Sequence, residues 1–197
     1  MGGHRGYVKV IAGPMFSGKT TELIRNLERY IYAKRRVLVF KPDIDVRYSV
    51  DSVSTHSGLK IGSFPIPPTM EGLKEMQRKI EEENCDVVGV DEINFMPVEL
   101  ASLANRLADA EKVVILAGLN LDFRGEVFPT TLAAIAKADA VKILTAICAK
   151  CGSKATRTQR VIDGEPAPYN SPVVMVGGRN SYEARCRKCH VVPGAPP

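Results

Sequence analysis

A glycine-rich stretch near the start of the chain has the residue types that can wrap a phosphate group. Residues 12–23 read AGPMFSGKTTEL and fit the pattern GxxxxGK followed by Ser or Thr. Glycine lets backbone N–H groups approach an anion closely, the lysine contacts the β- and γ-phosphate oxygens, and the hydroxyl binds Mg²⁺. The pattern therefore predicts a site for nucleotide phosphates. The predicted phosphate-binding residues are Gly13, Pro14, Met15, Phe16, Ser17, Gly18, Lys19 and Thr20.

This loop works only between a strand and a helix, and both are indicated by its flanks. The run YVKVIA at residues 7–12 is rich in β-formers, and after the loop apolar residues such as Leu23, Leu27 and Ile31 recur at helical spacing. The N-terminus of that helix would point at the anion. A chance glycine turn is the alternative, and the flanks argue against it.

A second candidate for Mg²⁺ binding is the acidic pair that ends an apolar run, VVGVDE at residues 87–92. A buried strand delivers such a carboxylate to the edge of a sheet, where it can hold Mg²⁺ beside a phosphate loop, and we assign this role to Asp91 with Thr20. Glu92 would point to the other side and could accept a proton from an attacking hydroxyl. The plain alternative is that both acids only terminate a strand.

The elements needed to position these groups alternate along the chain. Apolar runs predict strands, and amphipathic segments between them predict helices, which together indicate a parallel sheet covered on both faces. We expect a P-loop α/β domain of the RecA-like kind over residues 1–146. The predicted strands are 7–12, 37–42, 85–92, 112–119 and 139–146, and the predicted helices are 20–30, 68–83, 97–110 and 129–138.

Two CxxC pairs, CAKC and CRKC, mark a small irregular C-terminal domain over residues 147–192. Two such pairs supply the four thiolates of a closed, structural Zn²⁺ site of the zinc-ribbon type, with no open position for catalysis. Disulfides are the competing interpretation, and His190 could replace one ligand. Cys85 begins a predicted strand and is expected to be a core residue. The predicted zinc ligands are Cys148, Cys151, Cys186 and Cys189.

Composition limits the partners. The formal charge of +5 comes entirely from residues 146–190, which hold eight Lys and Arg against three Asp and Glu. Zinc-bound thiolates would offset part of this charge, so we expect no nucleic-acid partner. No stretch is long and apolar enough for a membrane span and no signal peptide is evident, so we expect no membrane partner and a cytoplasmic protein.

A P-loop domain followed by a split four-cysteine domain resembles the type II thymidine kinases. The resemblance rests on GPMFSGKTTELIR, DVRYS, THSG, VDEINF, GLNLDFRGEVF, TAICAKCGSKATRTQR and YEARCRKC, which stand in the family's order along nearly the whole chain. It implies ATP-dependent phosphorylation of deoxythymidine at the 5′-hydroxyl to give dTMP, in pyrimidine salvage. It also implies MgATP as donor, a structural Zn²⁺, a homotetramer and feedback by dTTP.

The resemblance also implies roles for individual residues. Glu92 corresponds to the general base on the 5′-hydroxyl, Lys19 with Thr20 and Asp91 to the MgATP apparatus, and Arg47 to a group near the transferred phosphate. The segment 173–182 corresponds to a lasso loop that closes over thymine; a plain β-hairpin arm is the alternative. The implied nucleoside-binding residues are Met15, Phe95, Leu119, Phe123, Phe128, Thr156, Val174, Met175, Val176, Gly177 and Tyr182.

The chain departs from the family pattern at Asn94, Met96, Asn120 and Pro129, and the shorter amide at position 94 questions any side-chain contact there. Two other functions use the same motifs. One is a nucleic-acid-binding P-loop ATPase whose zinc ribbon grips the backbone, and the other is a sensor that binds ATP and nucleoside without turnover. A strongly basic face with interleaved aromatics would favour the ATPase, but the C-terminal segment has only Tyr169 and Tyr182 as aromatics.

Overall fold

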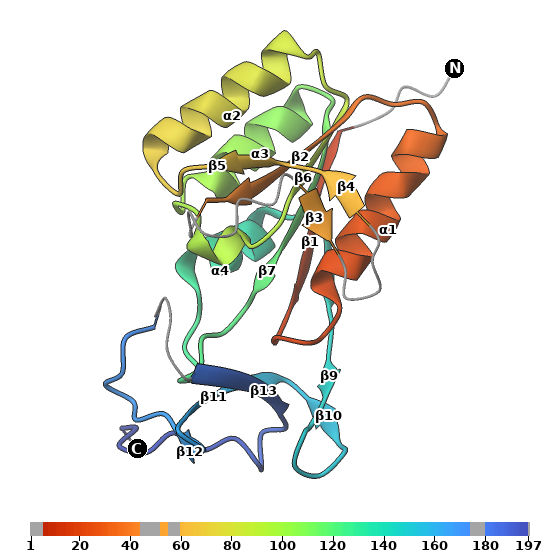
Figure 1. Cartoon of the computed structure of the whole chain (residues 1–197). Helices are drawn as coiled ribbons and strands as arrows, with labels where there is room; N and C mark the ends of the chain where they lie inside the picture. Colours follow the sequence, from red (N-terminus) through yellow and green to blue (C-terminus); the bar gives the residue numbers. More distant parts are fainter. Residues whose placement is uncertain (1–5, 44–51, 55–59, 174–179, 197) are drawn as a thin grey trace.

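The main structural unit is a six-stranded sheet in which every neighbouring pair of strands is parallel (Figure 1). A computed structural model describes residues 6–43, 52–54, 60–173 and 180–196 of the 197-residue chain. In spatial order the strands are β5 (Phe64–Ile66), β2 (Val37–Pro42), β6 (Val87–Val90), β7 (Val113–Leu119), β1 (Tyr7–Gly13) and β8 (Ala140–Ile143).

Four helices cover the two faces of this sheet, with α1 on one side and the other three opposite (Figure 1). Residues Leu23, Ile24 and Leu27 of α1 pack on one face, where Val113 and Ile115 of β7 point toward them. The helices are α1 (Lys19–Tyr32), α2 (Met70–Glu82), α3 (Leu100–Asp109) and α4 (Pro129–Lys137). All four predicted helices and the predicted layered α/β class are therefore confirmed.

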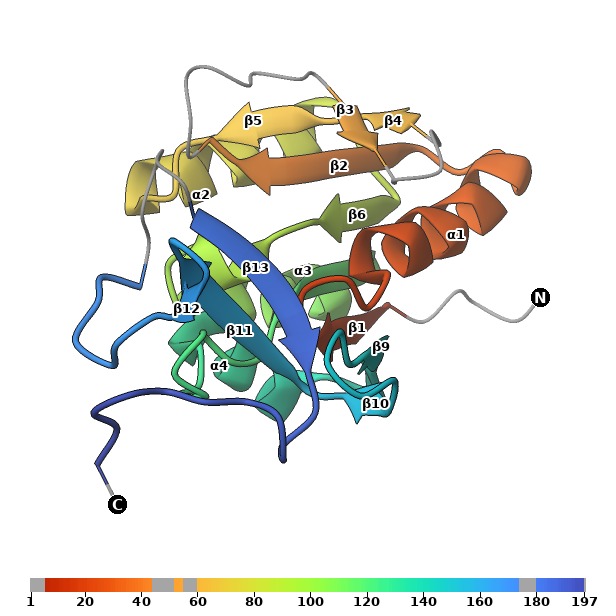
Figure 2. The same cartoon turned by 60° about the horizontal axis from the view of Figure 1, so that its bottom comes forward.

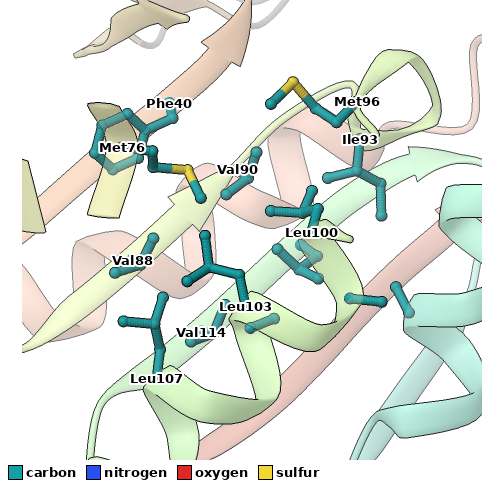
Figure 3. Close-up of a cluster of buried hydrophobic side chains, with 14 of the residues drawn as sticks. Phe40, Met76, Val88, Val90, Ile93, Met96, Leu100, Leu103, Leu107 and Val114 are labelled. Atoms are coloured by element: carbon teal, nitrogen blue, oxygen red, sulfur yellow. The ribbon is translucent and has the colours of Figure 1, made fainter. Parts of the chain in front are cut away.

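The larger hydrophobic core lies on the opposite face, and it is drawn in Figure 3. Strand residues Val88, Val90 and Val114 point toward Leu100 and Leu103 of α3, and all five are at most 3% exposed. In β7, Val114 faces this core while its neighbours Val113 and Ile115 face α1, because side chains alternate along a strand. Burial of both faces explains the continuous apolar runs of the sequence.

The prediction of five strands was wrong in number, since β5 adds a sixth at one edge of the sheet. Strand β5 has only the three residues FPI, and its proline and short length gave no strand signal in the sequence. Proline is tolerated there because β5 is an edge strand that pairs only with β2. The predicted strand 139–146 ends at Ile143. A further antiparallel pair, β3 (Ser52–Ser54) with β4 (Lys60–Gly62), was not predicted.

Two small antiparallel sheets follow the main sheet (Figure 2). The first is the pair β9 (Ala146–Ile147) and β10 (Lys154–Ala155); in the second, β11 (Arg157–Ile162) lies between β12 (Glu165–Pro166) and β13 (Asn180–Arg185). The boundary at 146/147 stays a prediction; Ala146 packs beside the cysteines of the small sheets. Of the helices that the structure describes, none has the length and apolarity needed to cross a bilayer.

A short 3₁₀ helix, η2 (Ile93–Phe95), follows β6 and accommodates two of the sequence departures. The Asn94 side chain is 8% exposed, and its Oδ1 accepts a hydrogen bond from the Leu119 N–H at 2.9 Å. The carbonyl of Met96 accepts a bond from the Thr130 hydroxyl at 2.5 Å, while its side chain lies in the larger core. Asn94 therefore makes a contact within the protein, between η2 and the end of β7.

We expect Asn94→Ala to lower the free energy of unfolding by about 1–3 kcal/mol, because the Leu119 N–H would lose its acceptor. Chemical denaturation followed by circular dichroism measures this change. Asn105→Ala is the control: its amide makes a 3.3 Å bond to Asp109 within α3, and its loss should change the same free energy by no more than about 0.7 kcal/mol. Equal effects of the two substitutions would contradict the assigned role of Asn94.

Candidate active site

The phosphate-loop pattern lies where β1 ends and α1 begins, as the sequence predicts. Gly18 caps α1 in the left-handed conformation, with φ 80° and ψ 26°. A Cβ at Gly13 would lie 2.6 Å from the Leu144 carbonyl oxygen, so only glycine fits at the end of β1. Both glycines are thus required by the backbone, and the loop is held between β1 and the segment after β8.

Inside the loop, polar groups converge on the carbonyl of Pro14. Lys19 Nζ and Ser17 Oγ each donate a hydrogen bond to that oxygen at 2.8 Å. Burial lowers the pKa of Lys19 to about 8, although the carboxylates of Asp91 and Glu92 act in the opposite direction. A phosphate placed here would favour the protonated amine, because the anion supplies a countercharge in place of the hydration that burial removes.

Asp91 follows directly after β6 and meets the first turn of α1. Its Oδ2 accepts a hydrogen bond from Thr20 Oγ1 at 2.8 Å, and its Oδ1 accepts one from the Glu92 N–H at 3.0 Å. The side chain is 6% exposed, and burial raises its pKa while these two bonds and Lys19 oppose the rise. The structure therefore brings together the hydroxyl and carboxylate that the sequence assigned to Mg²⁺, and oxygen ligands of this kind suit that ion.

Glu92 occupies a backbone conformation that few non-glycine residues adopt. Its φ of 52° and ψ of 39° lie in the left-handed region, and it precedes η2 without capping it through its side chain. Strained non-glycine positions of this kind persist where the surrounding structure requires them, and they cluster at functional sites. Glu92 is exposed whereas Asp91 is 6% exposed, so the two consecutive acids lie in different surroundings, which predicts a separate role for Glu92.

The electrostatic environment of Glu92 favours proton uptake. Part of the Glu92 side chain is exposed to solvent, but the surrounding protein groups displace water from its carboxylate, and this desolvation raises its pKa. The adjacent Asp91 carboxylate raises it further, while Lys19 and Lys41 act in the opposite direction. A carboxylate with a raised pKa is a stronger base than an ordinary surface glutamate.

Four of the predicted apolar nucleoside contacts lie at this edge of the sheet, at strand ends or in the segments that follow them. Phe95 of η2 and Phe128 at the start of α4 meet edge to face, with ring centroids 6.2 Å apart. Both are half-buried, as are Leu119 at the end of β7 and Met15 in the phosphate loop. Phe123 differs, because it is only 2% exposed and two guanidinium groups lie over its ring.

The small sheets contact the phosphate loop and the loop after β7 through specific hydrogen bonds. The Met15 N–H donates to the Thr158 hydroxyl at 3.1 Å, and His190 Nε2 lies 2.8 Å from the Phe123 carbonyl oxygen. Thr158 was not predicted, and its sequence context TRTQR offers no signal for it. The Thr156 hydroxyl instead lies near Arg157 Nη1 at 3.4 Å, and its predicted contact with the base stays a prediction.

The predicted cysteine cluster is formed. The sulfur atoms of four cysteines all lie within 4.8 Å of one another, and none of these cysteines forms a disulfide: Cys148, Cys151, Cys186 and Cys189. Four converging thiols match the tetrahedral donor set of a structural metal. Cys85 lies apart, is 1% exposed, and donates a 2.9 Å bond to the Val87 carbonyl, which confirms it as a core residue.

Some predicted residues fall outside the part of the chain that the structure describes. Tyr182 is within it, on β13 opposite Arg160 of β11. The predicted residues outside it are Arg47, Val174, Met175, Val176 and Gly177.

Comparisons with known proteins show the family of this chain. A family model described as thymidine kinase matches residues 6–190. The chain is 58% identical over 184 residues to "Thymidine kinase" of Pyrobaculum aerophilum, covering 93% of this chain and 98% of that protein. It is 51% identical over 188 residues to "Thymidine kinase" of Thermococcus kodakarensis, covering 95% of each chain. With "Thymidine kinase" of Mesoplasma florum it shares 46% identity over 187 residues, covering 95% of this chain and 92% of that one. A family match and whole-chain identity of this extent establish that this chain belongs to the thymidine kinase family.

Proposed function

We propose that the chain transfers the γ-phosphoryl group of MgATP to the 5′-hydroxyl of deoxythymidine, giving dTMP, with Glu92 as general base. The observation that supports this mechanism most directly is the left-handed turn at Asp91–Glu92. Asp91 bonds to Thr20, whereas Glu92 is exposed, and its carboxylate, with its raised pKa, is proposed to act on the acceptor hydroxyl.

On the donor side, the loop residues 13–20 bind the phosphates. Lys19 would exchange its bond to the Pro14 carbonyl for phosphate oxygens, and its positive charge would stabilise the charge that develops on the transferred group. Thr20 and Asp91 would hold Mg²⁺, which neutralises phosphate charge when bound. Arg47 is proposed to lie near the transferred phosphate.

On the acceptor side, Glu92 takes the proton of the 5′-hydroxyl. The hydroxyl oxygen forms a bond to the γ-phosphorus, and the bond between the γ-phosphorus and the bridging oxygen of the β-phosphate breaks. The proton ends on the Glu92 carboxylate, and ADP leaves. Positioning the two substrates in line supplies much of the remaining rate enhancement.

The nucleoside is proposed to lie against Met15, Phe95, Leu119 and Phe128, with Phe123, Thr156 and Tyr182 completing the site. The half-buried Phe95–Phe128 pair offers ring surface for a single pyrimidine ring. Segment 173–182, including Val174, Met175, Val176 and Gly177, is proposed to enclose the base.

We also propose that the four-cysteine cluster holds a structural Zn²⁺ and organises residues 147–192, while residues 1–146 form the kinase domain. Zinc suits four thiolates and needs no further ligand. A homotetramer and feedback by dTTP are further proposals from the family resemblance, and the cytoplasmic location expected from the sequence is proposed as well.

A nucleoside panel with MgATP tests the substrate assignment. We expect deoxythymidine to give its 5′-monophosphate far faster than deoxyadenosine or deoxyguanosine, because the aromatic pair suits one ring. Product is measured by chromatography. Comparable rates with purine nucleosides would overturn the thymidine assignment, and turnover of ATP stimulated only by DNA would favour the nucleic-acid-binding ATPase.

Glu92→Gln tests the base. It keeps the shape of the side chain but removes the proton acceptor, so kcat should fall about 10²- to 10⁴-fold, roughly 3 to 5 kcal/mol in transition-state stabilisation. Calorimetric titration should give nearly unchanged affinities for ATP and deoxythymidine.

The matched control for that substitution is Glu111→Gln. Glu111 is also an exposed glutamate with positive φ, at 61°, but it precedes β7 and so lies at the opposite end of the sheet. Its variant should keep wild-type kcat. Near wild-type turnover by Glu92→Gln, with both ligands shown to bind, would show that Glu92 is not the general base.

Metal analysis tests the cysteine cluster. Purified protein should contain about one Zn²⁺ per chain, and Cys148→Ser should lower that content because one of four ligands is lost. Cys85→Ala, outside the cluster, should leave the zinc content unchanged. A fully active wild-type preparation without metal would contradict the proposal.

A further inference from the structure

The most deeply buried cation among the described residues is Arg160, on the central strand of the three-stranded small sheet. Its side chain is 0% exposed, although arginine is almost never fully buried without compensating partners. Neither the phosphate loop pattern nor the cysteine pairs account for a buried arginine at this place. Its surroundings therefore need a separate explanation.

Aromatic rings from two different segments lie beside its guanidinium. Arg160 Cζ lies 5.5 Å from the centroid of Phe123, in the loop after β7, and 6.0 Å from the centroid of Tyr182 on β13. Arg160 and Tyr182 also face each other in the register of β11 and β13. Both distances are within the range of cation–π attraction, which strengthens when the cation is desolvated.

A third segment, which follows β12, contacts Arg160 through hydrogen bonds. Arg160 Nη1 donates to the Pro172 carbonyl at 2.6 Å, and the backbone carbonyl of Arg160 accepts from the Ala167 N–H at 3.0 Å. A charged donor makes this bond to Pro172 stronger than a neutral one. One side chain thus contacts the loop after β7, strand β13 and the segment after β12.

Strand β11 also carries Thr158, which contacts the phosphate loop. Thr158 is two residues before Arg160, so both side chains lie on one face of β11. Thr158 contacts the phosphate loop at Met15, whereas Arg160 contacts Phe123. One face of β11 therefore contacts both the phosphate loop and the loop after β7.

We infer that Arg160 is a positioning residue that sets the distance between Phe123 and Tyr182 and thereby governs affinity for the nucleoside. This inference rests on the proposed function, in which both aromatic residues belong to the nucleoside site. In this role Arg160 is assigned no direct contact with either substrate. It acts by keeping two aromatic side chains from separate segments at fixed places.

Arg124 provides a matched control, because its guanidinium lies over the same Phe123 ring at 5.8 Å. It also lies over Tyr169, and its charge is met by Asp122 at 2.9 Å and Glu126 at 3.7 Å. Replacing Arg124 therefore removes a cation from the Phe123 ring and leaves the contacts of Arg160 with Tyr182 and Pro172 in place.

The test compares Arg160→Met with Arg124→Met. Arg160→Met should raise the KM for deoxythymidine about 10- to 100-fold, the effect expected when one charge-assisted hydrogen bond and two cation–π contacts are lost. The KM for ATP and kcat should stay within about threefold, because Lys19, Thr20 and Asp91 keep their contacts. Arg124→Met should change none of the three constants beyond that range.

A variant with the charge but without the planar fork, Arg160→Lys, should give a smaller rise in the nucleoside KM than Arg160→Met. If Arg160→Met does not fold, as judged by zinc content and thermal unfolding, a double-mutant cycle of Arg160→Lys with Tyr182→Leu decides. Non-multiplicative effects of the two substitutions on nucleoside KM would support the inference, and independent effects would overturn it.

Two results would overturn the inference directly. These are an unchanged nucleoside KM in folded Arg160→Met, or equal rises of the nucleoside and ATP KM values. Calorimetric affinity of the wild type and the variants for deoxythymidine gives the same comparison without turnover. A wild type that binds deoxythymidine but forms no dTMP would defeat the proposed reaction while leaving the affinity comparison valid.

Discussion

The site depends on one constraint, which is that β1, β6 and β7 run parallel to one another. Parallel pairing brings the carboxyl ends of these strands to the same edge of the sheet. The phosphate loop leaves β1, the Asp91–Glu92 turn leaves β6, and the aromatic loop with Phe123 and Phe128 leaves β7. In this arrangement Thr20 and Asp91, which are 71 residues apart in sequence, share a hydrogen bond of 2.8 Å.

Two opposite demands are met where β6 ends. Asp91 must be buried to meet Thr20, and burial raises its pKa, so the hydrogen bonds it accepts are needed to favour its charged form. Glu92, the proposed general base, must stay accessible to act on a hydroxyl, and it is exposed. The left-handed turn satisfies both demands because it sends consecutive side chains to different surroundings, at the cost of backbone strain.

The small sheets are part of the same site because their contacts reach its loops. Thr158 meets the phosphate loop, and His190 and Arg160 meet the loop at Phe123 by a hydrogen bond and a ring contact. The four clustered cysteines are not among the residues that make these contacts. His190, once an alternative metal ligand, instead bonds to the Phe123 carbonyl.

The sequence by itself determined the features that are local or periodic. The phosphate loop, the acidic pair, the two CxxC pairs and the four helices were all predicted, because glycine requirements, thiol spacing and helical periodicity are written within a few residues. Only the tertiary structure decided the short edge strand β5, the turn at Glu92, and the contacts of Asn94, Thr158 and Arg160. Each of these depends on a partner far away in sequence: β5 needs β2, Asn94 needs Leu119, and Arg160 needs Phe123. A buried arginine resembles a surface arginine in the sequence, since its environment exists only after the chain has folded.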